Sequence, residues 1–343
     1  EEKMKQKKLA FVFLVCLCGL SACGMPEKTE TEKINIGLAS YNQSDTYINE
    51  LVSCFKEECN RLETNQHKIS VTVQDAAGSQ KIQNDQVKRL IKEGCNVLCV
   101  NLADRTNPSE IIEAAKESDV PIIFFNREPV AEDLNQWEKL YYVGAKAKQS
   151  GVMQGELAAD LIWERKTVDR NKDGKIQYVV LEGEMGHQDA IVRTESAVDS
   201  LKEKGVELEK LSYEIANWNR AQAQNRMTQM INQYNNQIEL VLANNDDMAL
   251  GAIDAYEKLG YTETDIPVFF GIDGTDEGLE AVLEEKMAAT IYNDKEAQAN
   301  AMAQLARQLV TGEKMKKVEF ENQRYIYLPY EKVTKDNVQD FLK

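Results

Sequence analysis

The sequence Ile34-Asn-Ile-Gly-Leu-Ala39 is a short apolar run, Asp45–Glu63 has the apolar spacing of a helix, and Ile69-Ser-Val-Thr-Val-Gln74 is a second apolar run. Short apolar runs between turn residues are typical of strands, and apolar residues three or four apart are typical of amphipathic helices. A strand, a helix and a second strand in this order form a βαβ unit with parallel strands. This stretch therefore predicts a parallel α/β fold.

The same alternation continues along the rest of the chain. Further strands are expected at Val97–Asn101, Pro121–Phe125, Tyr178–Leu181, Leu208–Tyr213, Glu239–Ala243, Val268–Gly271 and Ala289–Tyr292. Further helices are expected at Ser79–Glu93, Pro108–Ser118, Lys146–Arg165, Asp189–Lys204, Arg220–Tyr234, Asp247–Leu259 and Lys295–Val310. So many βα units exceed one sheet, and two Rossmann-like lobes with helices on both faces of parallel sheets are predicted.

Composition and charge exclude several classes of function. The 343 residues are 43% hydrophobic and 29% charged, which is typical of a globular chain. The net charge of −16 repels phosphate backbones, so nucleic acid is not expected as a partner. Two His are too few for a His-built metal centre. Neither G-x-G-x-x-G nor G-x-x-x-x-G-K-[ST] occurs, which argues against a nucleotide-using enzyme.

The N-terminal segment has the pattern of an export signal. Four lysines precede Leu9–Leu20, an uncharged apolar run of 12 residues. A bilayer span needs about 20 residues, so the run is too short for an ordinary membrane helix. A positive flank, a short apolar core and small residues together predict a signal peptide over residues 1–22. The alternative is a buried N-terminal helix, but nothing amphipathic follows the run.

Leu20-Ser-Ala-Cys23-Gly24 resembles the lipobox of bacterial lipoproteins, in which the cysteine is diacylated and becomes the new N-terminus. Two acyl chains are enough for stable anchoring. Cys23 is thus the expected lipidation site, residues 23–32 are a polar tether, and the protein is expected on the extracytoplasmic face of the cell membrane. Without residues 1–22, which hold four Lys and two Glu, the net charge is −18.

Four cysteines remain in the folded part: Cys54, Cys59, Cys95 and Cys99. Export permits disulfides. The cysteines nevertheless lie in helical or apolar strand patterns, which favours small buried side chains over disulfides. No Cys-x-x-Cys occurs, so a thiol redox site or zinc knuckle is not expected.

The segment from Asp169 to Gln177 follows the calcium-loop spacing D-x-[DN]-x-[DN]-G. Oxygens at loop positions 1, 3, 5 and 9 and the backbone carbonyl at position 7 can converge on one cation. These positions are Asp169, Asn171, Asp173, Gln177 and the carbonyl of Lys175. Position 12 is Val180 where the loop needs Glu, so the last carboxylate must come from elsewhere. The alternative is a polar turn without a cation.

Polar residues follow most of the predicted strands. In parallel sheets, ligands bind outside the carboxyl ends of the strands. The residues there are Asp45, Asn101, Asn126, the loop 183–189, Asn244, Asn245, Asp273 and Asn293, with Tyr47 and Trp218 close by. Asp and Asn suit vicinal hydroxyls, and aromatic rings suit the faces of a sugar ring, so a sugar site is predicted. Taken singly, Trp218 could be packing, Asn245 an N-cap and Asp273 a turn.

His187, Asp189 and Arg193 are expected to cluster at one helix N-terminus. In an enzyme, His187 would be an acid or base oriented by Asp189. In a binding protein, all three would hydrogen-bond ligand hydroxyls. A glycosidase needs two carboxylates flanking the bond, and no nucleophile motif accompanies these residues. Binding is therefore favoured, and no catalytic residue is expected.

From about Lys33 to Lys343 the chain resembles the periplasmic galactose/glucose-binding proteins, which are substrate-binding subunits of bacterial ABC sugar importers. The resemblance rests on the calcium loop and on Val120–Pro129, Tyr141–Gly144, Gly183–Asp189, Ala243–Gly251 and Ala289–Asp294. It implies a type I periplasmic-binding-protein fold whose lobes are joined by crossings near Asp119–Ile122, Tyr292–Lys295 and Tyr327–Tyr330. The N-terminal lobe is expected to be 33–120 plus 294–327, and the C-terminal lobe 121–293 plus 328–343.

The resemblance also implies roles for individual residues. Asp45, Asn101, His187, Asp189, Arg193, Asn245, Asp273 and Asn293 are expected to hydrogen-bond the sugar, and Trp218 to stack on it. Tyr47 stands where the family commonly has Phe, so the ring is kept and a hydroxyl is added. Glu239 falls where the family supplies the distant calcium carboxylate. Tyr41–Ser44 departs from the family pattern, which leaves the preference between epimers open.

By this resemblance the protein is a calcium-stabilised, lipid-anchored receptor for D-galactose or D-glucose. It closes on the sugar as a monomer, delivers it to an ABC permease in the membrane, and is not an enzyme. One alternative is a sugar sensor that docks to a chemoreceptor or sensor kinase. A repressor of the lac type shares the fold but needs a DNA-binding helix pair before the first strand, where residues 1–32 have the pattern of a signal and tether.

Overall fold

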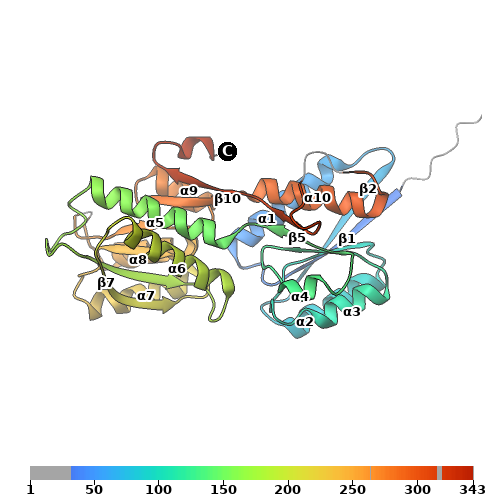
Figure 1. The fold of residues 1–343 in the computed structure, drawn as a ribbon, viewed down its shortest axis with the longest axis horizontal. Coiled ribbons are helices and arrows are strands. Elements are labelled where there is room, and N and C mark those ends of the chain that lie inside the picture. Colours follow the sequence, from blue (N-terminus) through green and yellow to red (C-terminus); the bar gives the residue numbers. More distant parts are fainter. Residues whose placement is uncertain (1–31, 263, 315–318, 343) are drawn as a thin grey trace, which may run out of the picture.

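The computed structural model describes residues 32–262, 264–314 and 319–342 and shows two α/β lobes side by side (Figure 1). Within these residues, the first lobe holds a six-stranded parallel sheet in the order β11-β5-β4-β3-β1-β2. Its strands are β1 (Glu32–Ser40), β2 (His67–Asp75), β3 (Val97–Val100), β4 (Ile122–Phe125), β5 (Leu140–Gly144) and β11 (Tyr325–Tyr327).

The second lobe repeats this plan with the order β12-β10-β9-β8-β6-β7. Its strands are β6 (Ile176–Glu182), β7 (Leu208–Ile215), β8 (Leu240–Ala243), β9 (Val268–Phe270), β10 (Ala289–Asn293) and β12 (Tyr330–Thr334). The edge strand β12 pairs antiparallel with β10, whereas the other pairs are parallel. The expected fold class, two lobes with parallel sheets, is confirmed.

Helices cover both faces of each sheet. In the first lobe, α1 (Thr46–Leu62) and α10 (Lys295–Thr311) pack on one face, and α2 (Gln80–Lys92) and α3 (Ser109–Glu117) on the other. In the second lobe, α5 (Ala147–Glu164) and α6 (Gln188–Glu203) lie opposite α7 (Arg220–Gln233), α8 (Asp246–Leu259) and α9 (Asp276–Leu283). The short helices α4 (Ala131–Leu134) and η1 (Val338–Asp340) complete the chain. Strands buried on both faces explain the continuous apolar runs in the sequence.

The first predicted crossing between the lobes is wrong. β4 pairs with β5 in the first sheet, with Ile122 opposite Leu140 and Phe125 opposite Val143. The chain therefore leaves the first lobe between β5 and α5, at 144–147, and not near Asp119–Ile122. A short apolar run carries no signal for which of two similar sheets it joins, and the expected boundary at 120/121 placed β4 and β5 in the wrong lobe.

The other two changes of lobe occur between β10 and α10, at 293–295, and between β11 and β12, at 327–330.

The predicted signal peptide, Cys23 and the tether up to residue 31 lie outside the described residues, and β1 begins at Glu32. In the part of the chain that is described, no helix has the length and apolar character needed to cross a membrane.

Candidate functional site

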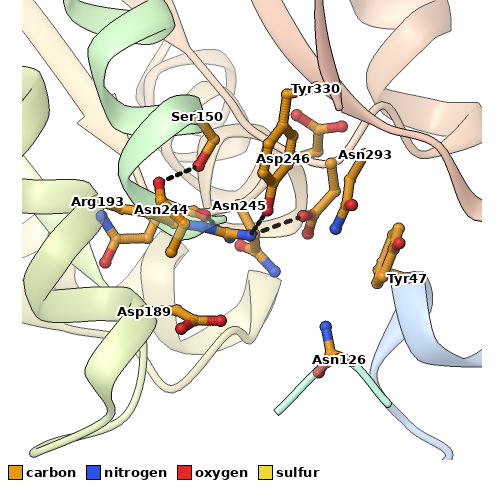
Figure 2. Close-up of polar contacts among 12 residues, drawn as sticks. Tyr47, Asn126, Ser150, Asp189, Arg193, Asn244, Asn245, Asp246, Asn293 and Tyr330 are labelled. Atoms are coloured by element: carbon orange, nitrogen blue, oxygen red, sulfur yellow. Dashed lines mark hydrogen bonds and ion pairs between the residues drawn. The ribbon is translucent and has the colours of Figure 1, made fainter. Parts of the chain in front are cut away.

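A polar cavity lies between the two lobes, beyond the carboxyl ends of the strands. Its walls are Tyr41, Asp45, Tyr47, Ile48, Asn126, Arg127, His187, Asp189, Arg193, Trp218, Asn245 and Asp273. Some of these side chains are labelled in Figure 2, where Tyr47 and Asn126 of the first lobe face Asp189, Arg193 and Asn245 of the second. Eight of the ten predicted ligand-binding residues are in this wall. Asn101 and Asn293 are not among the lining residues, but Asn101 bonds to Asn126 of the wall, and Asn293 shares the Gln298 amide with Tyr47.

Asp45 caps α1 and enters the cavity with both carboxylate oxygens engaged. Oδ1 accepts a hydrogen bond from the backbone N–H of Ile48 at 3.0 Å, and Oδ2 accepts one from the Tyr41 hydroxyl. Burial raises the pKa of Asp45, and the bonds from Tyr41 and Ile48 oppose that rise. The segment before Asp45 thus supplies Tyr41 as a direct partner of the carboxylate.

The hydroxyl of Tyr47 is anchored by Gln298 of α10. The Gln298 side-chain amide donates to the Tyr47 hydroxyl at 2.9 Å and to Asn293 Oδ1 at 2.6 Å. Gln298 is buried, so this amide joins α1 of the first lobe to the end of β10 in the second. The hydroxyl on Tyr47 therefore has a defined partner, which it shares with Asn293.

Asn101 is hydrogen-bonded to Asn126 of the cavity wall. Its amide donates to Asn126 Oδ1 at 3.0 Å and to the carbonyl of Phe125 at 3.1 Å. Asn101 Oδ1 is buried and has no hydrogen-bond partner within the described residues. Asn126 has a φ of 60°, in the left-handed region that Asn tolerates better than most residues. This turn aims Asn126 into the cavity and leaves Asn101 Oδ1 as an acceptor beside it.

His187 caps α6 and is held as a neutral ring. Nδ1 accepts the backbone N–H of Asp189 at 3.2 Å, so the ring hydrogen is assigned to Nε2. Burial lowers the pKa of His187 well below its usual value, and Arg127 and Arg193 add to this. Nε2 is buried and has no hydrogen-bond partner among the residues that the structure describes, which makes it a hydrogen-bond donor for a ligand. Asp189 contacts the ring through its backbone and not its carboxylate, so the two do not form an oriented acid–base pair.

The Arg193 side chain extends from α6 to the hydroxyl of Tyr330 (Figure 2). Its guanidinium donates to the carbonyl of Asn244 at 2.6 Å and to the Tyr330 hydroxyl at 3.1 Å, and pairs with Asp273 Oδ1 at 3.5 Å. Burial raises the pKa of Asp273 well above its usual value, and Arg193 counteracts this. The buried guanidinium therefore balances the carboxylate and fixes where its oxygens lie.

Trp218 forms an apolar wall beside these polar groups. A β-carbon on Gly183 would lie 2.0 Å from the indole, so only glycine leaves room for the ring there. The Asn245 amide donates to the Trp218 carbonyl at 3.2 Å, and the His187 ring packs edge-on at 5.2 Å between centroids. The Arg193 guanidinium carbon lies 5.8 Å from the indole centroid. The indole is thus held rigidly at the edge of the cavity.

Contacts between the lobes flank the cavity on two sides. Arg127 donates to Glu184 at 2.9 Å and Arg105 to Gln188 at 3.1 Å, on the side of the loop that carries His187. On the other side, Thr46 donates to Asp247 at 2.6 Å. Lys295 is buried between Glu50 and Asp276, pairing with the latter at 2.8 Å. The lobes are therefore closed onto each other around the cavity.

The chemistry of the cavity suits a neutral ligand rich in hydroxyl groups. Asp45, Asp189 and Asp273 are acceptors, and burial raises the pKa of each. Arg127 and Arg193 balance these charges from inside the same wall. Vicinal hydroxyls both donate and accept, and they can satisfy carboxylates, amides and a neutral imidazole together. Tyr47 and Trp218 offer apolar surface for the ring.

Five contributors to the site were not identified from the sequence: Tyr41, Ile48, Arg127, Gln298 and Tyr330. Arg127 follows Asn126 after β4, so the rule on strand ends could have found it. Gln298 lies inside α10, and Tyr330 begins the edge strand β12. Neither position differs in pattern from an ordinary helix or strand residue, and their roles arise only from the packing of distant segments.

The predicted calcium loop is a compact turn at the start of β6. Asp169 Oδ2 accepts from Gly174 N at 3.0 Å, and Asp173 Oδ1 accepts from Lys175 N at 2.8 Å. The Gln177 amide donates to Asp173 Oδ2 at 2.9 Å, and the Asn171 amide donates to Gln177 Oε1 at 2.9 Å. The turn thus draws its polar side chains into one cluster.

Glu239 lies against this loop although it is distant in sequence. Its carboxylate accepts the backbone N–H groups of Arg170 at 2.6 Å and Gln177 at 3.2 Å. Asp169 Oδ1 is buried and lacks a hydrogen-bond partner in the described part of the chain, so it is free to act as a cation ligand. Within the described ranges, no three His, Cys, Asp or Glu side chains gather closely enough to hold a metal by themselves. A site here needs the amide and carbonyl oxygens as well, and these are the ligands that calcium accepts.

Cys59, Cys95 and Cys99 are buried, and Cys54 is half-buried. None of the four forms a disulfide with another cysteine of the described residues. Burial raises the pKa of Cys59 to about 12 and that of Cys95 to about 11, so both thiols stay protonated. The prediction of buried cysteines is confirmed for these three.

Comparison with known proteins places the chain in a family. Residues 36–314 match the model of the periplasmic binding protein domain. The D-galactose/methyl-galactoside binding periplasmic protein MglB of Haemophilus influenzae is 36% identical over 90% of this chain and 92% of its own length. A putative rhizopine-binding protein of Rhizobium meliloti is 30% identical over 80% of this chain and 82% of its own length.

A solved structure supports the same grouping. An ABC transporter solute-binding protein from Bacillus halodurans, with bound myo-inositol, superposes with a TM-score of 0.75 and 28% identity over 91% of this chain and 98% of that one. The two-lobed fold, the cavity and these similarities agree. The chain belongs to the family of periplasmic binding proteins, the extracytoplasmic solute-binding proteins of sugar importers, and is not an enzyme.

Proposed function

We propose that this protein is a hexose receptor that closes on D-galactose or D-glucose and delivers it to an ABC permease in the membrane. The observation that carries the proposal is the cavity between the lobes, where buried carboxylates, a guanidinium and a neutral imidazole meet the rings of Tyr47 and Trp218. The similarity to MglB supports an aldohexose. Other relatives are named for a rhizopine and for xylitol, so the identity of the sugar is the part that needs measurement.

The geometry suggests how binding drives closure. The first lobe supplies Asp45, Tyr47 and Asn126, and the second supplies Asp189 and Asp273 among others. A sugar held by both sets satisfies buried polar groups that would otherwise lack partners when the lobes meet. Closure is then a hinge motion about the segments 144–147, 293–295 and 327–330. The closed monomer is the form offered to the permease.

Titration with D-glucose and D-galactose is expected to stabilise the protein and change its tryptophan fluorescence, because Trp218 lies in the cavity wall. At a sugar concentration of about 100 times Kd, the free energy of unfolding should rise by about 2.7 kcal/mol. L-glucose is the matched control, since it has the same groups with opposite handedness. Absence of a thermal shift with every aldohexose tested would contradict the proposal.

We also propose that the loop 169–177 with Glu239 binds calcium. The support is the mixed set of oxygens at Asp169, Asn171, Asp173, Gln177, Glu239 and the Lys175 carbonyl, together with the unpartnered Asp169 Oδ1. Bound calcium would supply positive charge among three carboxylates. The loop lies at the N-terminal end of β6, whereas the cavity lies beyond the C-terminal end of this strand. Because the cation would be far from the cavity, its role is structural.

We propose further that Cys23 is lipidated and anchors the receptor. In bacteria that process lipoproteins, the wild-type chain should partition into the detergent phase of a Triton X-114 extract. Cys23→Ser should move the protein to the aqueous phase, because two acyl chains supply the membrane affinity. Cys54→Ser is the matched control and should stay in the detergent phase. Equal partitioning of wild type and Cys23→Ser would refute the anchor.

A further inference from the structure

Tyr41 holds the carboxylate of Asp45 in one orientation. The two oxygens of Asp45 accept from different donors, the backbone N–H of Ile48 at 3.0 Å and the hydroxyl of Tyr41. The terminal torsion of an unrestrained aspartate is broad, so a free carboxylate can turn toward a ligand. With both oxygens engaged, that rotation is blocked. The lone pairs left for a ligand then point in set directions.

Arg127 holds the ring of Tyr41 in turn. Its guanidinium carbon lies 3.5 Å from the ring centroid of Tyr41, which is cation–π contact. The same guanidinium donates to the carbonyl of Ala103 at 3.1 Å and to Glu184 at 2.9 Å. Arg127 and Tyr41 are each 4% exposed. Glu184 belongs to the second lobe, so the stack on Tyr41 is completed from across the cavity.

The backbone of Tyr41 is supported separately from its phenol. Its carbonyl accepts the N–H of Gly78 at 2.7 Å, and the neighbouring Ser40 carbonyl accepts the N–H of Ala76 at 2.9 Å. Removal of the hydroxyl therefore leaves the loop after β1 in place. What the hydroxyl controls is the side chain of Asp45.

We propose that Tyr41 is a positioning residue that sets which hydroxyl stereochemistry the receptor accepts, by holding Asp45 in one orientation. This inference rests on the proposed function as a hexose receptor. A fixed carboxylate meets a hydroxyl on one side of a sugar carbon and misses the hydroxyl of the epimer on the other side. A freely turning carboxylate can meet either, because a small rotation compensates for the change of position. Selectivity arises from the mismatch that is not tolerated.

The Arg127–Glu184 pair has a different expected effect. It joins the two lobes next to Tyr41, so it contributes to closure around any ligand. Loss of this pair lowers the affinity for all sugars by a similar factor, since every bound sugar needs the closed form. Loss of the Tyr41 hydroxyl changes the relation between epimers. The two roles are therefore separable by measuring several sugars on the same variants.

The test compares Tyr41→Phe with the wild type against D-glucose and its epimers at C2, C3 and C4, which are D-mannose, D-allose and D-galactose. Kd values are measured by calorimetry, or by competition for weak sugars. Tyr41→Phe should change the affinity ratio of one epimer pair toward unity by about fivefold or more, leaving the other ratios within about twofold. The affected pair identifies the carbon that faces Asp45.

Two matched variants complete the design. Tyr178→Phe removes a buried phenol hydroxyl that bonds Tyr213 at 2.8 Å, outside the cavity wall, and should leave all ratios unchanged. Glu184→Gln should raise the Kd of every sugar by a similar factor. If Tyr41→Phe leaves the affinity ratios between the epimers unchanged, or lowers the affinity for all four sugars by the same factor, Tyr41 is not a selectivity residue. If the wild type binds none of the four sugars, the proposed function fails instead.

Discussion

Replacement of Trp218 by alanine is expected to weaken hexose binding by about 30-fold or more, because buried Trp anchors commonly contribute about 2 kcal/mol or more to binding. The indole forms the apolar wall of the cavity and also packs against the His187 ring and below the Arg193 guanidinium. Its loss removes the surface for the sugar ring and frees two polar side chains that it orients. Calorimetric titration with D-glucose and D-galactose measures the change.

Two further variants separate binding from folding. Trp218 packs in the core of the second lobe, so Trp218→Ala also lowers stability, and its fold is checked by circular dichroism. Trp218→Phe keeps a flat ring and should lose less than about tenfold in affinity. Trp163→Ala is the matched control, since Trp163 is 49% exposed on α5, outside the cavity wall. Unaltered affinity in a folded Trp218→Ala would exclude the indole from the site.

Removal of calcium is expected to lower the melting temperature by about 5 °C or more, as a cation at about 100 times its Kd adds about 2.7 kcal/mol to stability. Without the cation, Asp169, Asp173 and Glu239 are left to repel one another, with hydrogen bonds within the loop as their compensation. Thermal melts in calcium and in EGTA measure the difference. The sugar Kd should change by less than about twofold, because the loop and the cavity lie at opposite ends of β6.

The matched variant is Asp173→Asn, which removes one carboxylate and keeps the size of the side chain. Its melting temperature should be nearly the same in calcium and in EGTA. Asp199→Asn, on the exposed surface of α6, is the control and should respond to EGTA like the wild type. A wild-type melting temperature that does not depend on EGTA would favour a polar turn without a cation.

Most of the secondary structure was predictable because each element has a strong local pattern. β1 and β3 are buried apolar runs, and α1 buries one face and begins at an aspartate whose side chain caps it. β5, β11 and β12 were not expected, since short strands at or near a sheet edge have weak patterns. The lobe to which β4 belongs was predicted wrongly for a related reason. An apolar run specifies burial but not the sheet in which it is buried.

The candidate site was predictable to the extent that strand ends converge. Asp45, His187, Asp189, Trp218, Asn245 and Asp273 follow strands or lie at helix N-termini, whereas Arg193 lies inside α6, and all seven line the cavity. Asn101 follows β3 and Asn293 ends β10, but neither is among the residues that line the cavity, and they bond to Asn126 and Gln298 respectively. Sequence position predicts the edge of the sheet at which a residue lies. It does not predict whether the side chain lines the cavity or bonds to a neighbouring residue instead.

The sequence by itself determined the α/β class, the two lobes and the polar edge at which a ligand binds, because these follow from periodicity and from the order of strands and helices. Only the tertiary structure decided where the chain first crosses between the lobes, that Gln298 holds Tyr47, and that Arg127 reaches Glu184 over the ring of Tyr41. These contacts join residues tens to hundreds of positions apart. They depend on how the two lobes pack against each other, which no local sequence pattern specifies.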